Sequence, residues 1–239
     1  MYKQICANLR EIQAGIKLVQ LDLRQYIATK KTKNEYIHTK LLSYLITCWV
    51  EVRILKLAYE PPAFTPEETK EIISSSTLEN KWITALNIAI CKAYKISEIQ
   101  DIDTIAHNIA FTARTRYMEL IKLIKDDILE SMQVRNRIVH GQWLYAFTDD
   151  LMDISSEITG RLRRENIVIL QLRLALFTSL AQIIHDLAVS RPTYDRDFDS
   201  NYKKIEVQRK NLHHRDYSIY KRKQIEKYQR GLHKRRKNI

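Results

Sequence analysis

Glycine and proline restrict what this chain can fold into more than any other feature, because there are so few of them. The 239 residues include four glycines and four prolines. Sandwiches and barrels need many tight turns, which draw on these two residue types. The 45% apolar content is enough to build a sizeable core. We therefore expect an all-α fold in which long helices pack as a bundle.

Several enzyme classes lack their signatures in this chain. It has no GxxxxGK[ST] phosphate loop, no GxGxxG fingerprint, no GxSxG elbow, no HExxH pair and no DxDxDG calcium loop. The cysteines Cys6, Cys48 and Cys91 lie far apart in apolar helical surroundings. We expect them to be small buried side chains in a reducing compartment rather than a zinc site. The sequence thus predicts no cofactor and no bound metal.

Apolar residues at three- and four-residue spacing predict where the helices lie. One long amphipathic helix is expected over 4–31 and a second over 34–60, which is apolar nearly all round between 41 and 58 and therefore central. A strongly apolar helix is expected over 165–189. Altogether we expect five or six helices over residues 1–190.

Two segments have the sequence of a helix start. Thr32 followed by Glu35 matches a capping box. Thr65-Pro66-Glu67-Glu68 combines an N-cap residue, a proline at the first helical position and acids near the positive helix end. After Gly141, the segment QWLYAFTDDLMDI surrounds a turn signal, which favours a small hairpin, with a helix as the alternative.

Neither a leader nor a membrane span is expected from the apolar stretches. The N-terminal segment MYKQICANLREIQ is amphipathic and charged rather than continuously apolar. The apolar run at 41–50 is too short to cross a bilayer, and Arg173 and several polar residues interrupt the run at 168–184. We expect a cytoplasmic protein without a membrane partner.

The positive charge is concentrated at the C-terminal end. Residues 191–239 hold sixteen Lys and Arg against six Asp and Glu, and so carry +10 of the net charge of +12. The composition predicts a basic, tyrosine-rich helical extension over 191–239, attached to a helical domain over 1–190. Such a mixture suits phosphate contacts with aromatic stacking, although an acidic protein partner or a merely solvated face fits the same charge. The candidate RNA-binding residues here are Lys203, Lys204, Arg209, Lys210, Lys221, Arg222, Lys223, Lys234, Arg235 and Arg236.

The segment MQVRNRIVHGQW, residues 132–143, places Arg135, Asn136 and His140 within six positions of one another. If the chain is helical up to His140, Gly141 follows the helix end, where a left-handed backbone favours glycine. At about 100° per residue, Asn136 and His140 lie about 40° apart, whereas Arg135 and His140 lie about 140° apart. Arg135 must therefore reach round the helix or meet a partner from elsewhere, and a symmetric dimer would supply one.

These three side chains suit the cleavage of an RNA backbone without a metal. A histidine can take the proton from a 2′-hydroxyl or give one to the leaving 5′-oxygen. An arginine grips two phosphate oxygens and stabilises the charge of the transition state. An asparagine can hold the imidazole tautomer or donate to phosphate. The expected product is a 2′,3′-cyclic phosphate, and DNA should be inert.

The segment Arg135-Asn136-Arg137-Ile138-Val139-His140 resembles the Arg-polar-x-x-x-His motif of the HEPN superfamily. That resemblance, over the motif and the helical region 1–190, implies a small all-α domain that forms homodimers. It also implies a metal-independent ribonuclease of toxin–antitoxin or phage-defence systems, with an antitoxin or another defence protein as partner. Arg135 and His140 would be catalytic, Asn136 would be the supporting polar residue, and Arg137 would contact RNA.

Three alternatives stay open. The domain could have lost catalysis and serve as a dimeric RNA-binding scaffold. His140 could simply be a cation near a helix C-terminus, with Arg135 and Arg137 solvated or paired with nearby acids. Glu51 and Arg53 are charges set in an apolar stretch that need partners, which structural salt bridges could supply, or Glu51 could orient Arg135 or His140.

The Arg-x4-His spacing alone is weak evidence for the motif, because Arg209 and His214 repeat it in the extension. Lys210 follows Arg209 in place of a polar second residue, and no glycine follows His214. We also expect no core helix before that copy.

Overall fold

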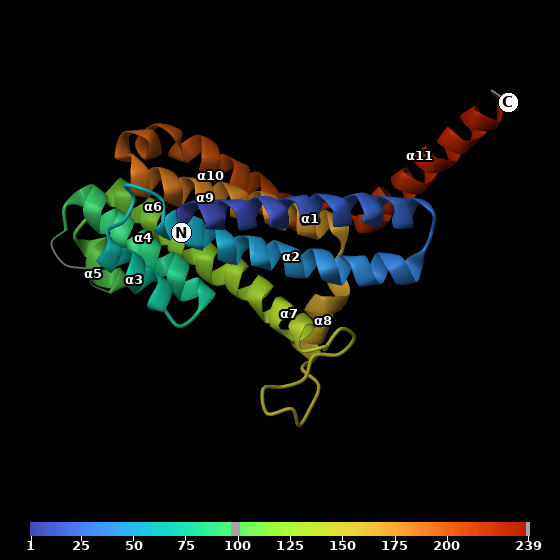
Figure 1. Ribbon diagram of the computed structural model, residues 1–239, viewed down its shortest axis with the longest axis horizontal. Coiled ribbons are helices and arrows are strands. Elements are labelled where there is room, and N and C mark those ends of the chain that lie inside the picture. Colours follow the sequence, from blue (N-terminus) through green and yellow to red (C-terminus); the bar gives the residue numbers. More distant parts are fainter. Residues whose placement is uncertain (97–100, 238–239) are drawn as a thin grey trace.

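The computed structural model describes residues 1–96 and 101–237, with side chains through Arg235, and these residues form an all-α bundle, as predicted. Figure 1 shows the arrangement. The α-helices are α1 (Tyr2–Ala28), α2 (Thr32–Ala58), α3 (Pro66–Ser74), α4 (Leu78–Tyr94), α5 (Ile102–His107), α6 (Phe111–Leu123), α7 (Leu129–Val139), α8 (Ser156–Arg164), α9 (Ile167–Val189), α10 (Arg191–His214) and α11 (Tyr217–Lys237). A single π-helical turn, η1 (Ile124–Ile128), joins α6 to α7.

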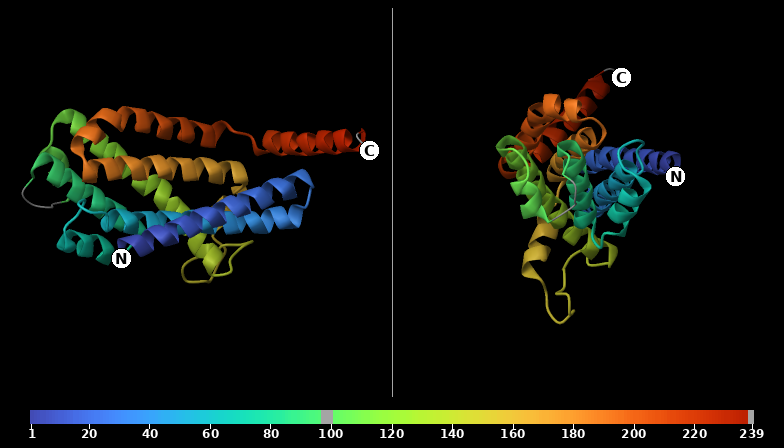
Figure 2. Two further views of the ribbon diagram at one scale, coloured as in Figure 1. Left: turned by 45° about the horizontal axis from the view of Figure 1, so that its top comes forward. Right: turned by 90° about the vertical axis from the view of Figure 1, so that its left-hand side faces the viewer.

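The central helix is α2, as its apolar sequence predicts. It packs against α1, α7 and α9, and its residues Leu42, Ile46 and Ile54 are almost completely buried. Figures 1 and 2 show α1 and α2 side by side along the long axis, with α9 and α10 forming the other long pair. The main core lies between these two pairs and α4.

The region up to residue 190 is divided into more helices than the five or six predicted. Asp101 caps the start of α5 by accepting hydrogen bonds from the backbone N–H groups of Asp103 and Thr104, both at 3.0 Å. α5 ends at His107 and α6 begins at Phe111, so the chain breaks into two helices at 108–110. The sequence of α8, SEITGRLRR, has only two large apolar residues, Ile158 and Leu162, which pack in the small second core.

Of the two predicted helix starts, the N-cap at Thr65 is confirmed and the capping box at Thr32 is wrong. At the start of α3, the Glu68 N–H donates to Thr65 Oγ1 at 3.2 Å, and the Thr65 N–H donates to Glu68 Oε2 at 2.7 Å. At the start of α2 no side chain caps the helix. Glu35 instead accepts hydrogen bonds from the Tyr217 hydroxyl and from Lys221 Nζ, at 2.8 Å for Oε2, because those residues of α11 lie against it.

The C-terminal residues divide into two parts. Within α10, Tyr194, Phe198 and Ile205 are buried in the same core as α9. Beyond Arg215, α11 contacts the end of α1 and then projects away from the bundle (Figures 1 and 2). The basic residues of 191–239 therefore lie partly on a helix of the bundle and partly on a projecting helix.

In the described part of the chain, α9 is the one helix that is long and apolar enough to cross a membrane. It packs against α2, α4 and α10, and 56% of its most apolar window is buried inside the bundle. A core helix of this kind passes the same test of length and composition.

Candidate functional site at the end of α7

The candidate site stands where α7 ends. The Gly141 N–H donates to the Ile138 carbonyl at 3.1 Å and the Gln142 N–H donates to the Arg137 carbonyl at 2.8 Å, which is the Schellman arrangement of a helix C-terminus. Gly141 has φ +74°, in the left-handed region that glycine adopts most readily. The predicted role of Gly141 is confirmed, and His140 is the last residue before this turn.

The loop after Gly141 is fastened to the helices around it. Trp143 Nε1 donates to the Ile138 carbonyl at 2.9 Å, and the Tyr36 hydroxyl of α2 donates to the Trp143 carbonyl. The Trp143 ring packs against a small second core of Val134, Ile138, Ala146 and Leu162. These contacts of Trp143 hold the backbone beside His140 in place. No sequence pattern points to Tyr36 as a participant, since the contact joins residues far apart in the chain.

The segment expected to be a hairpin or a helix forms a narrow turn. Phe147 and Ile154 make an isolated antiparallel bridge, and the Thr148 N–H donates to the Asp153 carbonyl at 2.9 Å. The hairpin alternative is thus correct for its tip, and Leu151 takes a left-handed φ of +60° there. Several apolar side chains of this loop, Leu144, Leu151 and Met152 among them, are exposed.

The Arg135 guanidinium is held by two partners. One Nη atom forms an ion pair with Glu51 on α2, and the other donates to Asn136 Oδ1 at 3.1 Å. The side chain is 23% exposed, and its Nε is buried without a hydrogen-bond partner among the described residues. Glu51 therefore pairs with Arg135, a contact that fits both a structural salt bridge and an orienting role, and Arg135 forms no ion pair with the acids at 126–130.

Arg53, the other charge in that stretch of α2, does not share this role. Burial lowers the pKa of its guanidinium, while the Glu60 carboxylate opposes that effect. Arg53 thus belongs to a polar group at the opposite end of α2 from Tyr36, with Glu60, Tyr2 and Lys56.

Asn136 and His140 are both exposed on the surface of α7. The His140 imidazole makes no hydrogen bond or ion pair with any residue that the structure describes. Arg137, expected to contact RNA, forms an ion pair with Asp149 of the following loop at 2.6 Å. The structure therefore brings Arg135 and Asn136 together, leaves His140 accessible, and commits Arg137 to a contact within the chain.

The candidate RNA-binding residues of the extension fall into two groups. Arg209 pairs with Asp126 at 3.2 Å and lies 3.6 Å from Asp127, and Lys221 pairs with Glu35, so these cations attach α10 and α11 to the bundle. Arg222 lies 3.9 Å from Glu226. The remaining side chains of the set that the structure describes are exposed: Lys203, Lys204, Lys210, Lys223, Lys234 and Arg235. The side chain of Arg236 lies outside the described residues.

Comparisons with protein-family models, with curated proteins and with solved structures give no match to this chain. Among the described residues, no three or more His, Cys, Asp or Glu side chains are grouped as a metal site would require.

Proposed function

We propose that this protein is a metal-independent endoribonuclease of the HEPN type. The observation that carries the proposal is the end of α7, where an accessible histidine stands on a fixed helix terminus and Arg135 is held on the same helix by Glu51. Catalytic groups need such rigid support, because small displacements cost much of the rate.

In this proposal His140 and Arg135 have different roles. The 2′-oxygen of the substrate attacks the adjacent phosphorus while imidazole takes its proton, and the bond from phosphorus to the 5′-oxygen breaks as that oxygen gains a proton. The arginine N–H groups not used by Glu51 and Asn136 would donate to the phosphate oxygens. The two products are a 2′,3′-cyclic phosphate end and a 5′-hydroxyl end.

A homodimer would complete the site. Because Arg135 and His140 point in directions about 140° apart on one helix, a single α7 offers them poorly to one phosphate. A two-fold axis near the helix end would bring the arginine of one protomer towards the histidine of the other. Cytoplasmic action in a toxin–antitoxin or phage-defence system, with an antitoxin or other defence protein as partner, follows from the HEPN resemblance.

The exposed cations of α10 and α11 would contribute RNA affinity. Contacts of Lys and Arg with phosphates release counterions, so this affinity should fall steeply with salt. Lys223, Lys234 and Arg235 are the best placed, because they stand on the projecting helix and make no ion pair in the described part of the chain.

Cleavage in EDTA tests the proposal. Purified protein is incubated with mixed RNA beside His140→Ala and Arg135→Ala variants, and the ends of the fragments are analysed. We expect cyclic-phosphate ends from the wild type and none from either variant. Light scattering at micromolar concentration should show a dimer, and a strict monomer would contradict the shared site.

A catalytically inactive, dimeric RNA-binding scaffold is the second candidate. It is favoured by the contacts of Arg135, whose guanidinium is already engaged by Glu51 and Asn136. A scaffold should bind RNA equally well as wild type, His140→Ala and Arg135→Ala, should cut nothing, and should lose affinity when the cations of α11 are replaced.

A further inference from the structure

Tyr44 is an aromatic side chain that the packing of α2 leaves partly exposed. The structure describes α2 in full, and most of the helix is buried between α1, α7 and α9. Tyr44 is nevertheless 37% exposed, and no other large apolar residue of α2 is as accessible. Burial in the core does not explain why an aromatic ring stands at this position.

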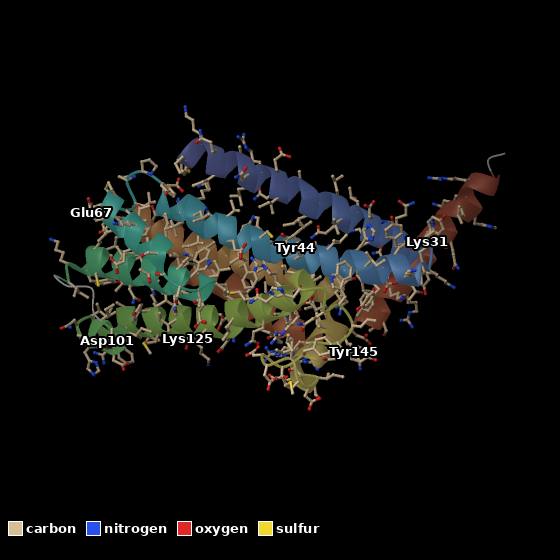
Figure 3. All side chains as sticks on the ribbon, turned by 60° about the horizontal axis from the view of Figure 1, so that its bottom comes forward. Lys31, Tyr44, Glu67, Asp101, Lys125 and Tyr145 are labelled. Atoms are coloured by element: carbon tan, nitrogen blue, oxygen red, sulfur yellow. The ribbon has the colours of Figure 1, made fainter. Side chains whose placement is uncertain are left out.

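The ring stands on the face of α2 that holds Arg135. Tyr44, Cys48 and Glu51 follow one another at four- and three-residue spacing and so share one side of the helix. Glu51 forms the ion pair with Arg135. The neighbouring Cys48 thiol is the main cause of the raised pKa of Tyr44, and the Arg135 guanidinium opposes that rise, so the phenol lies within the electrostatic reach of the guanidinium. Figure 3 labels Tyr44 midway along α2.

Tyr44 also stands near the level of His140. Two contacts show that α2 and α7 run in opposite directions: Glu51 meets Arg135, and Tyr36 meets the Trp143 carbonyl just beyond the end of α7. At about 1.5 Å per residue, Tyr44 lies about 10 Å along α2 from Glu51, and His140 lies about 7.5 Å along α7 from Arg135. Both displacements run towards the same end of the helix pair.

We propose that Tyr44 forms a nucleobase subsite, in which its ring stacks on a base next to the phosphate bound by Arg135 and His140. This proposal rests on the proposed ribonuclease function and adds to it a preference for unpaired RNA, because only an unstacked base offers a free face. Stacking on an aromatic ring tolerates every base, so the subsite would add affinity without strong sequence choice. The tyrosine hydroxyl is not required for it.

The test uses a short single-stranded oligonucleotide that contains 2-aminopurine beside one linkage and 2′-deoxyribose throughout, so that it binds without being cut. Stacking should quench its fluorescence when it binds the wild type. Tyr44→Phe should retain the quenching, whereas Tyr44→Ala should lose it and bind about tenfold more weakly. Phe111→Ala, which removes an 80% exposed ring on α6, is the matched control and should change nothing.

The outcomes separate this subsite from the cleavage chemistry. Equal quenching and affinity for Tyr44→Ala and wild type would overturn the subsite, as would failure of the wild type to bind, provided circular dichroism shows that both are folded. If quenching depends on Tyr44 but the protein does not cut the same oligonucleotide made with ribose, the ribonuclease proposal is wrong and the base subsite is retained.

Discussion

The two Arg-x4-His segments of this chain have the same spacing and end up in different structural roles. Arg135 and His140 end α7, and Arg209 and His214 end α10. Arg135 forms an ion pair with one carboxylate, that of Glu51 on α2, and retains N–H groups that could donate to a ligand. Arg209 lies between two carboxylates of η1 and connects α10 to the π-helical turn.

The backbone just after each histidine differs more than the spacing. Gly141 turns the chain sharply, and Trp143 and Tyr36 fasten the loop, whereas Arg215 continues in an extended conformation with φ −80°. The expectation that no core helix precedes the second copy is wrong, because α10 buries Phe198 and Ile205 in the main core. The comparison shows that the contacts around a short motif, rather than its letters, decide its use.

The largest expected difference between the two copies is in the RNA cleavage rate after each histidine is replaced. If His140 is the general acid or base, His140→Ala should lower RNA cleavage by a factor of about 10² to 10⁴, whereas His214→Ala should leave it unchanged. Initial rates on one RNA substrate measure both. Equal losses in the two variants would show that the difference between the copies has no bearing on catalysis.

Replacing Arg135 should reduce cleavage, whereas replacing Arg209 should reduce stability. Arg135→Ala should reduce cleavage by a factor of about 10² to 10³, as expected when a donor to the transition state is removed. Arg209→Ala should keep its activity but unfold more easily by about 1 kcal/mol, because two acids lose a partly exposed partner. Rates and urea titrations report the two effects, and an inactive but stable Arg209→Ala protein would reverse the assignment.

Glu51→Gln sharpens the comparison by weakening the support of Arg135 alone. We expect cleavage to fall about tenfold while RNA affinity stays the same, since the amide can still accept a hydrogen bond but no longer pairs as a charge. Asp126→Asn makes the equivalent change beside Arg209 and should leave cleavage unaltered. A rise in activity for Glu51→Gln would mean that Glu51 restrains Arg135 instead of positioning it.

The residue after each histidine should matter only in the first copy. Gly141→Ala forces a side chain into a left-handed backbone and should lower the free energy of unfolding by about 1 kcal/mol, although no atom crowds the new methyl group. Arg215→Ala should have almost no effect, because its φ suits any residue. Denaturant midpoints decide, and equal shifts would contradict the turn geometry.

The smallest predicted effect is a pH dependence at the second copy. Burial raises the pKa of Asp127, so the folded protein binds more protons than the unfolded chain between the ordinary carboxyl pKa and the raised one. The free energy of unfolding of the wild type should therefore fall relative to Asp127→Asn as pH rises through that window. Parallel urea titrations from about pH 4 to pH 7 measure this, and a wild type that keeps or gains stability relative to Asp127→Asn as the pH rises would contradict it.

The helices could be predicted where local patterns decide the structure. The sequence of α1 has a long amphipathic period, and α2 and α9 are long segments that are apolar nearly all round. The Thr65–Glu68 capping box uses only residues within one turn. Glu35 has equally good local chemistry but is used by Tyr217 and Lys221, which lie far along the chain. Sequence patterns cannot weigh such a distant competitor.

The candidate site shows the same division. The helix end at Gly141 follows from local sequence, and the structure reproduces it. The pairing of Arg135 with Glu51 was one open alternative, since nothing in a single sequence fixes which helices become neighbours. Neither the π-helical turn nor α8 was predicted, because η1 has only five residues and α8 only nine, too few for an apolar period to repeat.

The most direct test of the ribonuclease proposal uses a DNA oligonucleotide with one ribonucleotide at its centre, incubated with the protein in EDTA and examined by mass spectrometry. The wild type should cut only after the ribose and leave a 2′,3′-cyclic phosphate there, and His140→Ala should leave the strand intact. An uncut strand, a cut elsewhere, or the same cut made by His140→Ala would contradict the proposed chemistry.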